Sequence, residues 1–348
     1  MTIELNKFFE SITFLSPLKN MEEIEHVIER RQDPLSGRFA IGSNELVGKG
    51  QFFFGPTDHD LIEKVARESR ENCFFCPENV EGTTPRYTGD WLAEGCLKKG
   101  ECILFPNLFP VSAVHAVVAL GRAHYRKLDD FPADLLEDGL STSVEFCKSL
   151  YRAMPENKYF TINSNYLFPA GASLVHPHMQ IFGGKYPASI TNETLEACRR
   201  FFEDEALSYF DQLLKLERQL GQRYVIGEGP LEWLTPFAPM GTNEVLGIVP
   251  GCQHLLMLSD QAIAGLANGI SKVLAFYSKM DFSTFNFSIY SAPLDGSRNF
   301  FPVFIRIICR QNVRPNYRTD DYFIQKLLGE ELMLTLPEDL ARNLKDFW

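Results

Sequence analysis

The chain has 348 residues, 45% of them hydrophobic, and a formal net charge of −11. This length allows two core-forming domains, since one domain usually takes roughly 100 to 200 residues. The acidic balance argues against a protein that coats nucleic acid, because such proteins need a basic surface. Residues 1–20 lack a basic region followed by a long apolar run, and no stretch reaches the roughly 20 apolar residues of a membrane-spanning helix. We therefore expect a cytoplasmic protein with no nucleic-acid or membrane partner.

The first half of the chain is predicted to alternate between strands and helices. From Ser11 to about Ser43 the pattern predicts a mixed helix, a Pro-Gly turn and an apolar strand. Two β-rich runs lie between Leu104 and Leu120, and residues 131–154 have helical periodicity. Further strands are expected at Tyr159–Asn165 and from His178 to Phe182. The predicted order is strand, strand, helix, strand, strand.

The second half repeats this order after a linking helix. Apolar residues separated by charged ones predict that helix over roughly residues 192–222. The repeated elements are strands at 233–237 and 244–249, a helix at 259–279, and strands at 286–290 and 301–309. We predict an α+β protein with a degenerate duplication: two antiparallel-sheet repeats with flanking helices, over residues 1–190 and 191–348. Two unrelated α+β domains are the alternative.

Cys73-Phe74-Phe75-Cys76 contains the one closely spaced pair among eight cysteines. This spacing lets two thiolates bind one zinc ion from a tight turn. In a large protein of a reducing compartment, the pair indicates metal or redox chemistry before a disulfide framework. Zinc is favoured, because a redox dithiol normally opens a helix and a polar loop follows here. His124 and His176 are the candidates that complete a tetrahedral structural site, with His115 as their rival.

His176-Pro177-His178-Met179-Gln180 places two imidazoles two positions apart, on the same face of a strand. In isolation such a pair is equally consistent with a metal chelate or with packed surface residues. Upstream, the run from Ala170 to Ser173 supplies small residues and a hydroxyl that let a loop approach a phosphate. A neutral imidazole is a competent nucleophile toward phosphorus, and neutral donors such as Gln180 and Ser173 can stabilise the phosphoryl oxygens. The motif therefore indicates transfer through a phosphoramidate.

These motifs resemble the galactose-1-phosphate uridylyltransferase branch of the histidine-triad superfamily. The resemblance rests on specific motifs over about residues 30–185 and is weak over the rest of the chain. The segments that carry it are, in order, Arg31–Arg38, Leu104–Pro110, Val117-Val118, His124, Asn165, Gly171–Ser173 and His176–Gln180. It implies a duplicated histidine-triad-like fold, with the metal and the active site in the first repeat, and a homodimer.

The resemblance also implies roles for individual residues. His178 would be the nucleophile that becomes nucleotidylylated, with Gln180 and Ser173 on the transferring phosphate. The residues implied in substrate binding are Asn107 at the nucleoside, Asn165 at the phosphate, and Phe105 and Phe109. The ligands implied for one structural Zn²⁺ are Cys73, Cys76, His124 and His176, which agrees with the set reached from spacing.

The sequence departs from the family pattern at four places. Leu108 replaces an aspartate that contacts the nucleoside, and Lys49 is the only cation where the family has an arginine pair. The apolar run Phe300–Ile305 replaces histidines that hold a second metal in many members, so we predict one metal site. The segment that binds the hexose phosphate is unrecognisable in Asn316–Tyr322.

We therefore expect a nucleotidylyltransferase of carbohydrate metabolism that moves an NMP group from a nucleoside diphosphate sugar to a sugar phosphate or another phosphate acceptor. A phosphorylase of nucleotide sugars or dinucleotides, or a hydrolase of the same fold, is the nearest alternative. A non-catalytic nucleotide-binding protein is the alternative from another class. The base, the sugar and the acceptor stay open at this point.

Overall fold

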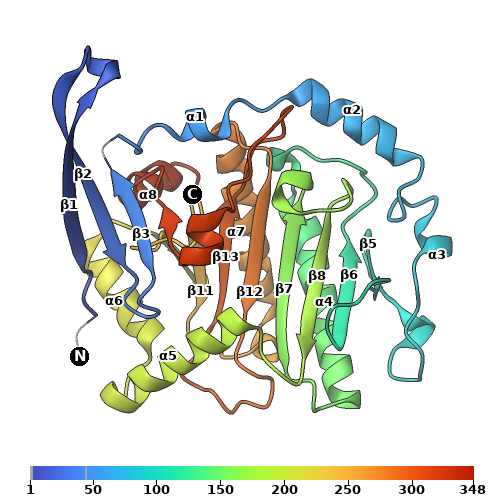
Figure 1. Cartoon of the computed structure of the whole chain (residues 1–348). Helices are drawn as coiled ribbons and strands as arrows, with labels where there is room; N and C mark the ends of the chain where they lie inside the picture. The colour runs from blue at the N-terminus through green and yellow to red at the C-terminus, as the bar shows by residue number, and fades with distance from the viewer. Residues whose placement is uncertain (1–2, 44) are drawn as a thin grey trace.

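A ten-stranded antiparallel sheet forms the centre of the computed structural model, which describes residues 3–43 and 45–348 (Figure 1). Asn44 of the run Ser43–Lys49 lies outside the described residues. From one edge to the other, the strands of this sheet are β4 (Leu97–Lys99), β5 (Cys102–Pro106), β6 (Val114–Ala119), β8 (His178–Gly184), β7 (Tyr159–Tyr166), β12 (Phe285–Tyr290), β13 (Val303–Cys309), β11 (Val245–Val249), β10 (Leu231–Leu234) and β9 (Tyr224–Glu228).

The two halves of the chain contribute the same arrangement of strands. The order β4-β5-β6-β8-β7 is followed by its counterpart β12-β13-β11-β10-β9, and the halves join where β7 pairs with β12. Each half also places one long helix between its third and fourth strands: α4 (Ala133–Ala153) and α7 (Asp260–Lys279). The predicted α+β class is confirmed, and the two repeats share one continuous sheet. The boundary at residue 190 stays a prediction.

The helices α4 and α7 pack against each other and cover one face of this sheet, behind the strands in Figure 1. The close approach depends on glycine: a Cβ at Gly269 of α7 would lie 1.9 Å from the Trp233 ring of β10. Along β8, Met179 and Ile181 face this helix-covered core. His178 and Gln180 therefore point to the opposite face, since side chains alternate along a strand.

The N-terminal region is a β-hairpin, so the predicted helix between Ser11 and Ser43 is wrong. β1 (Lys7–Ser16) pairs antiparallel with β2 (Glu22–Gln32), which continues to β3 (Phe39–Ser43) and the short parallel β14 (Glu331–Leu332) in a separate four-stranded sheet. β1 is rich in aromatic and β-branched residues, among them Phe8, Phe9, Ile12, Thr13 and Phe14, a composition that favours strands over helices. The predicted apolar strand before Ser43 corresponds to β3.

The predicted linking helix is divided into α5 (Ser189–Glu205) and α6 (Tyr209–Leu220). Ala206 has a φ of 55°, a left-handed conformation that ends α5, and the Ser208 hydroxyl accepts the Asp211 backbone N–H to begin α6. The remaining α-helices are α1 (Gly50–Phe54), α2 (His59–Arg70), α3 (Val80–Thr83) and α8 (Pro337–Lys345). Within residues 3–43 and 45–348, no helix is long and apolar enough to cross a membrane.

Candidate active site and metal centre

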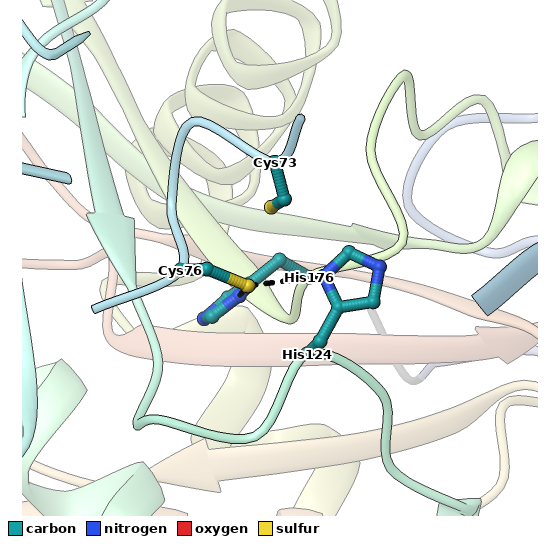
Figure 2. Close-up of side chains that lie close together, drawn as sticks. All are labelled: Cys73, Cys76, His124 and His176. Atoms are coloured by element: carbon teal, nitrogen blue, oxygen red, sulfur yellow. Dashed lines mark hydrogen bonds between the residues drawn. The ribbon is translucent and has the colours of Figure 1, made fainter. Parts of the chain in front are cut away.

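The cysteine pair occupies a tight turn between α2 and α3. The Cys76 backbone N–H points to the Cys73 carbonyl at 3.4 Å, and the Asn79 side-chain amide donates to that carbonyl at 3.0 Å. Both thiols are buried, and Figure 2 shows them beside two imidazoles from distant parts of the first half. His124 comes from the loop after β6, and His176 from the loop that leads into β8.

The four side chains form one buried cluster. One ligand atom from each of Cys73, Cys76, His124 and His176 lies within 4.8 Å of all the others. Cys76 Sγ is 3.3 Å from His124 Nδ1 and 3.6 Å from His176 Nδ1. In a tetrahedral zinc site, bond lengths of about 2.0–2.3 Å separate neighbouring donors by roughly 3.3–3.8 Å. The spacing and the donor set therefore fit a zinc ion.

The surroundings of the two imidazoles support this fit. His124 Nε2 lies 2.9 Å from the Ser69 hydroxyl of α2, and His176 Nε2 donates to the Gly121 carbonyl at 3.1 Å. Each ring therefore has its Nε2 engaged and turns Nδ1 toward the cysteines, as outer hydrogen bonds do for ligating histidines. Burial lowers the pKa of His176 to about 4, so this ring is neutral and able to ligate.

The buried Cys76 thiol needs a nearby cation to ionise at neutral pH. Burial, followed by the charge of the neighbouring Cys73 thiolate, raises the pKa of Cys76 to about 12. Two thiolates side by side are unfavourable without a compensating ion, and a bound metal supplies that compensation. With four protein donors such a site is closed, which is typical of a structural metal.

His178 begins β8 and is 4% exposed. Its Nδ1–H donates to the His176 carbonyl at 2.9 Å, which fixes the tautomer and leaves the lone pair on Nε2. Burial lowers the pKa of His178, so the ring is neutral. The Phe75 ring, from the turn that holds the cysteines, lies 5.4 Å from the His178 ring in an edge-on arrangement.

A chain of hydrogen bonds orients the neighbouring amide of Gln180. The Val111 backbone N–H donates to His115 Nδ1 at 3.2 Å, so the proton of this ring is on Nε2. His115 Nε2 then donates to Gln180 Oε1 at 2.8 Å. Gln180 Nε2 is left facing His178 Nε2, at 3.5 Å. Asn107 Nδ2 lies 3.1 Å from His115 Nε2, a contact between two donors that brings Asn107 beside His115 without a hydrogen bond. From the sequence, His115 was expected only as a rival metal ligand, whereas the structure places it in the series of hydrogen bonds that orients Gln180.

A hollow of about 520 Å³ opens beside Gln180 on this face of the sheet. It is lined from both halves of the chain, with Asn163 and Asn165 on β7 and Ser288 and Tyr290 on β12. The start of α5 and the side chain of His115 complete it. The hollow combines these amide and hydroxyl groups with apolar walls from Val111, Phe182 and Ile190, a lining that suits a ligand with both an apolar body and hydrogen-bonding groups.

The other expected site residues lie in different surroundings. Phe105 is buried in a small cluster with Val117 on β6, close to the Phe75 ring. Phe109 is 78% exposed on the loop after β5, where its backbone N–H donates to Asn107 Oδ1 at 2.8 Å. Ser173 is exposed on the loop between β7 and β8.

The second half has a different pair of residues in the corresponding positions. Gln180 pairs with Asn163 across β7 and β8, and Arg306 pairs with Ser288 across β12 and β13. Asn163 and Ser288 face each other at the junction of the halves, so Arg306 corresponds to Gln180 and Phe304 to His178. Phe304 packs in an apolar cluster with α6, so the residue at this position of the second half is part of the hydrophobic core.

No family model matches the chain. A protein of Archaeoglobus fulgidus, described as uncharacterized, is 29% identical to it over 326 residues, and this region covers 93% of each chain.

Several solved structures have the same architecture at low sequence identity. An ADP-glucose phosphorylase from Arabidopsis thaliana with bound ADP-glucose has a TM-score of 0.68 at 18% identity, over 92% of this chain and 99% of that one. A GalT-like protein from the same plant has a TM-score of 0.66, and a uridylyltransferase has 0.65, both at 18% identity over 91% of this chain and 98% of theirs. The predicted resemblance to the galactose-1-phosphate uridylyltransferase branch is thus confirmed at the level of the fold.

Proposed function

We propose that the protein is a nucleotidylyltransferase in which His178 carries the nucleotidyl group. The observation that carries this proposal is the fixed tautomer of His178. Its Nδ1–H is held by the His176 carbonyl, and its neutral Nε2 bears a lone pair beside the Gln180 amide. A nucleophilic imidazole needs this arrangement, because the attacking nitrogen must be unprotonated and held in place.

The reaction proceeds in two displacements at phosphorus. Nε2 attacks the α-phosphorus of a nucleoside diphosphate sugar, the new P–N bond forms, and the bond to the bridging oxygen breaks to release the sugar phosphate. A phosphate oxygen of the acceptor then attacks the nucleotidyl-histidine, the P–N bond breaks, and Nε2 regains its lone pair. Two in-line inversions give net retention at phosphorus.

The neutral donors around His178 stabilise the charge that spreads over the phosphoryl oxygens. In this proposal Gln180 and Ser173 contact the transferring group and Asn165 helps to hold it, while Asn107 and Phe109 bind the nucleoside and the buried Phe105 holds the end of β5 that precedes them. Asn107 and Gln180 already share His115 as a neighbour, which supports a nucleoside and a phosphate bound side by side.

Cys73, Cys76, His124 and His176 would hold a structural zinc ion, which supplies folding energy and positioning. The backbone of His176 connects this cluster to the reacting ring, because its carbonyl accepts the His178 proton. The cluster thereby fixes the start of β8 and the orientation of the nucleophile.

A phosphorylase is the second candidate. The solved structure with a TM-score of 0.68 is described as an ADP-glucose phosphorylase, and the first displacement is the same in both reactions. With inorganic phosphate as acceptor, the products are a nucleoside diphosphate and a sugar phosphate. Product analysis with inorganic phosphate or a sugar 1-phosphate as acceptor separates the two candidates. A binding protein without catalysis releases neither product.

Intact-protein mass spectrometry tests the proposal. Wild type and His178→Gly are incubated with UDP-glucose, ADP-glucose and other nucleoside diphosphate sugars, without an acceptor. We expect a mass gain of one NMP on wild type alone, with metal content equal in both proteins. The proposal is refuted if the adduct persists on His178→Gly, or if nucleotide binds to wild type and no donor leaves an adduct.

We also propose a homodimer, as the resemblance implies. The hairpin of β1 and β2 extends beyond the body of the molecule (Figure 1), and exposed apolar side chains lie on both of its faces, with Phe9 and Leu15 on one and Phe8, Ile12 and Phe14 on the other. Ile24 and Ile28 of β2 extend the second of these, which we call the apolar face, because they pair with residues of β1 that point to this side. A second copy presenting the same face would cover it, which is the isologous contact that twofold symmetry produces.

A further inference from the structure

A second set of hydrogen bonds crosses the junction between the two halves, on the face that holds His178. It begins at Asn286 on β12, which pairs with Asn165 on β7. We propose that Asn286, held by Arg310, is a positioning residue that orients the Asn165 amide for the transferring phosphate. This proposal rests on the proposed function, and it gives the second half a part in the active site.

The orientation of the Asn286 amide follows from two neighbours, one of which can only accept a hydrogen bond and the other only donate one. Its Nδ2 lies 2.9 Å from the Ala170 carbonyl, which only accepts hydrogen bonds. Its Oδ1 lies 2.6 Å from Arg310 Nη1, which only donates. The amide can therefore have one orientation, with nitrogen toward Ala170 and oxygen toward Arg310.

This orientation determines that of Asn165. Asn286 Nδ2 also donates to the Asn165 side chain at 2.7 Å, so Asn165 must present Oδ1 to it. The Nδ2 group of Asn165 is then the part of the amide that remains for the hollow that this residue lines. An N–H donor there matches a phosphoryl oxygen, whereas a flipped amide would present an oxygen and repel it.

Arg310 is held by a second partner. Its Nε and Nη2 donate to the two oxygens of Asp320 at 2.9 and 2.7 Å, a bidentate pair. The guanidinium therefore has both its charge and its direction fixed, and Nη1 is kept on Asn286. Asp320 belongs to the segment Asn316–Tyr322, in which the family's hexose-phosphate pattern is unrecognisable, so in this chain the segment has a role of its own.

The same amide also anchors the loop between β7 and β8. Leu167 has a φ of 61°, which is unfavourable for a branched side chain, and Gly171 has a φ of 87°. Such a backbone persists only where its surroundings hold it. The bond from Asn286 to the Ala170 carbonyl lies between these two positions and just before Ser173. One side chain of the second half thus restrains both Asn165 and the loop of Ser173.

A double-mutant cycle tests the proposal. Asn286→Asp keeps an acceptor for Arg310 and removes the donor to Asn165, so the Asn165 amide turns its nitrogen toward residue 286. We expect the single-turnover rate of adduct formation on His178 to fall about tenfold, the loss that one reversed hydrogen bond produces. In the Asn165→Ala background, the same substitution should cost clearly less, because only the lost bond to Ala170 and its effect on the loop of Ser173 then remain.

Asn312→Asp is the matched control. Asn312 is a buried amide that donates to the carbonyls of Gly55 and Asp281 at 2.8 and 2.9 Å, away from the hollow. This variant should lower stability and leave the adduct rate unchanged. Equal losses from Asn286→Asp in both backgrounds would overturn the proposal, because they would show a general structural role.

If wild type forms no adduct with any donor, the proposed function fails and the positioning role is judged without catalysis. The same four proteins are then compared by urea unfolding. Asn165→Ala and Asn286→Asp should lower the unfolding midpoint by less together than the sum of their separate effects. Additive losses would show that the two amides are not coupled, and would overturn the positioning role.

Discussion

His178 and His115 use their two ring nitrogens in opposite ways. His178 donates from Nδ1 to a carbonyl and keeps Nε2 free to accept, whereas His115 accepts at Nδ1 from the Val111 N–H and donates from Nε2. The first ring therefore has the tautomer of a nucleophile, and the second that of a residue that orients an amide. Both tautomers are set by backbone groups, which substitutions of side chains leave in place.

His115→Phe should separate these two roles. The ring volume is retained, but Gln180 Oε1 loses its donor, and the amide is free to turn its oxygen toward the phosphoryl group. We expect the single-turnover rate of adduct formation to fall about tenfold, with nucleotide binding less affected. Quenched single-turnover assays with intact-mass detection measure the rate of adduct formation. Elemental analysis of the metal content is the control. Loss of metal from this variant would contradict the placement of His115 outside the zinc cluster.

The site could be predicted from the sequence where residues are close in the chain or follow strand alternation. The pairs Cys73–Cys76 and His176–His178 have such spacings, and the structure brings the four expected ligands together. His115 carried a weaker signal, because alternation along β6 does not say which cross-strand neighbour it meets. Asn286 carried none, because its contact with Asn165 depends on two halves of the chain meeting at β7 and β12.

At the scale of elements, the metal cluster connects three segments that lack regular structure: the turn after α2, the loop after β6 and the loop before β8. Loops of this kind contribute little apolar burial to hold them in place. A bound metal would replace that burial with ligand bonds, and it would do so next to His178.

Cys73→Ser should therefore remove the metal and lower stability together. The hydroxyl is a poor zinc ligand, and three donors remain in a buried, polar cluster. We expect zinc content, measured by elemental analysis, to fall from about one ion per chain to near zero. The melting temperature should fall by several degrees, because each loss of about 1 kcal/mol shifts it by roughly 2–4 °C in a domain of about 150–250 residues, and the lost ligand bonds amount to several such losses. Cys96→Ser, at another buried thiol, should keep the metal. Wild-type protein purified without chelator and free of zinc would contradict the site.

The errors in the predicted elements have local physical causes. The hairpin of β1 and β2 was predicted to include a helix, since its apolar residues fit both periods over a few turns and pairing with a distant strand decides between them. The linking helix was predicted as one piece because its apolar residues, Leu207 among them, are separated by charged ones on both sides of Ala206. Its left-handed conformation, followed by the Ser208 cap, divides it. Tertiary context overrode local propensity at both places.

For the whole molecule, the duplication has produced halves of equal topology and unequal chemistry. Phe304 stands where the first half has His178, and it packs against α6. Arg306 stands where the first half has Gln180, and it forms an ion pair with the buried Glu244. The second half has thus become a support for the first: it completes the sheet, lines the hollow with Ser288 and Tyr290, and supplies Asn286.

The projecting hairpin of β1 and β2 favours the association of two molecules. A two-stranded ribbon has little stability of its own in water, and within residues 3–43 and 45–348 the part of β2 before Ile28 pairs with β1 alone. Ile12 and Phe14 on the apolar face are 57% and 43% exposed. Such a face on a projecting ribbon favours a twofold contact with a second copy, and among the described residues β1 is an edge strand, with β2 as its one partner.

Ile12→Glu should therefore convert the proposed dimer into a monomer, because the twofold axis places two like charges in one apolar contact. Thr13→Glu is the matched control: it adds the same charge at the next position of β1, on the other face of the hairpin. Light scattering after size exclusion measures the mass, with 39.6 kDa expected for one chain. Wild type at that mass would contradict the dimer, and dissociation by both variants would place the contact at the strand edge in place of the apolar face.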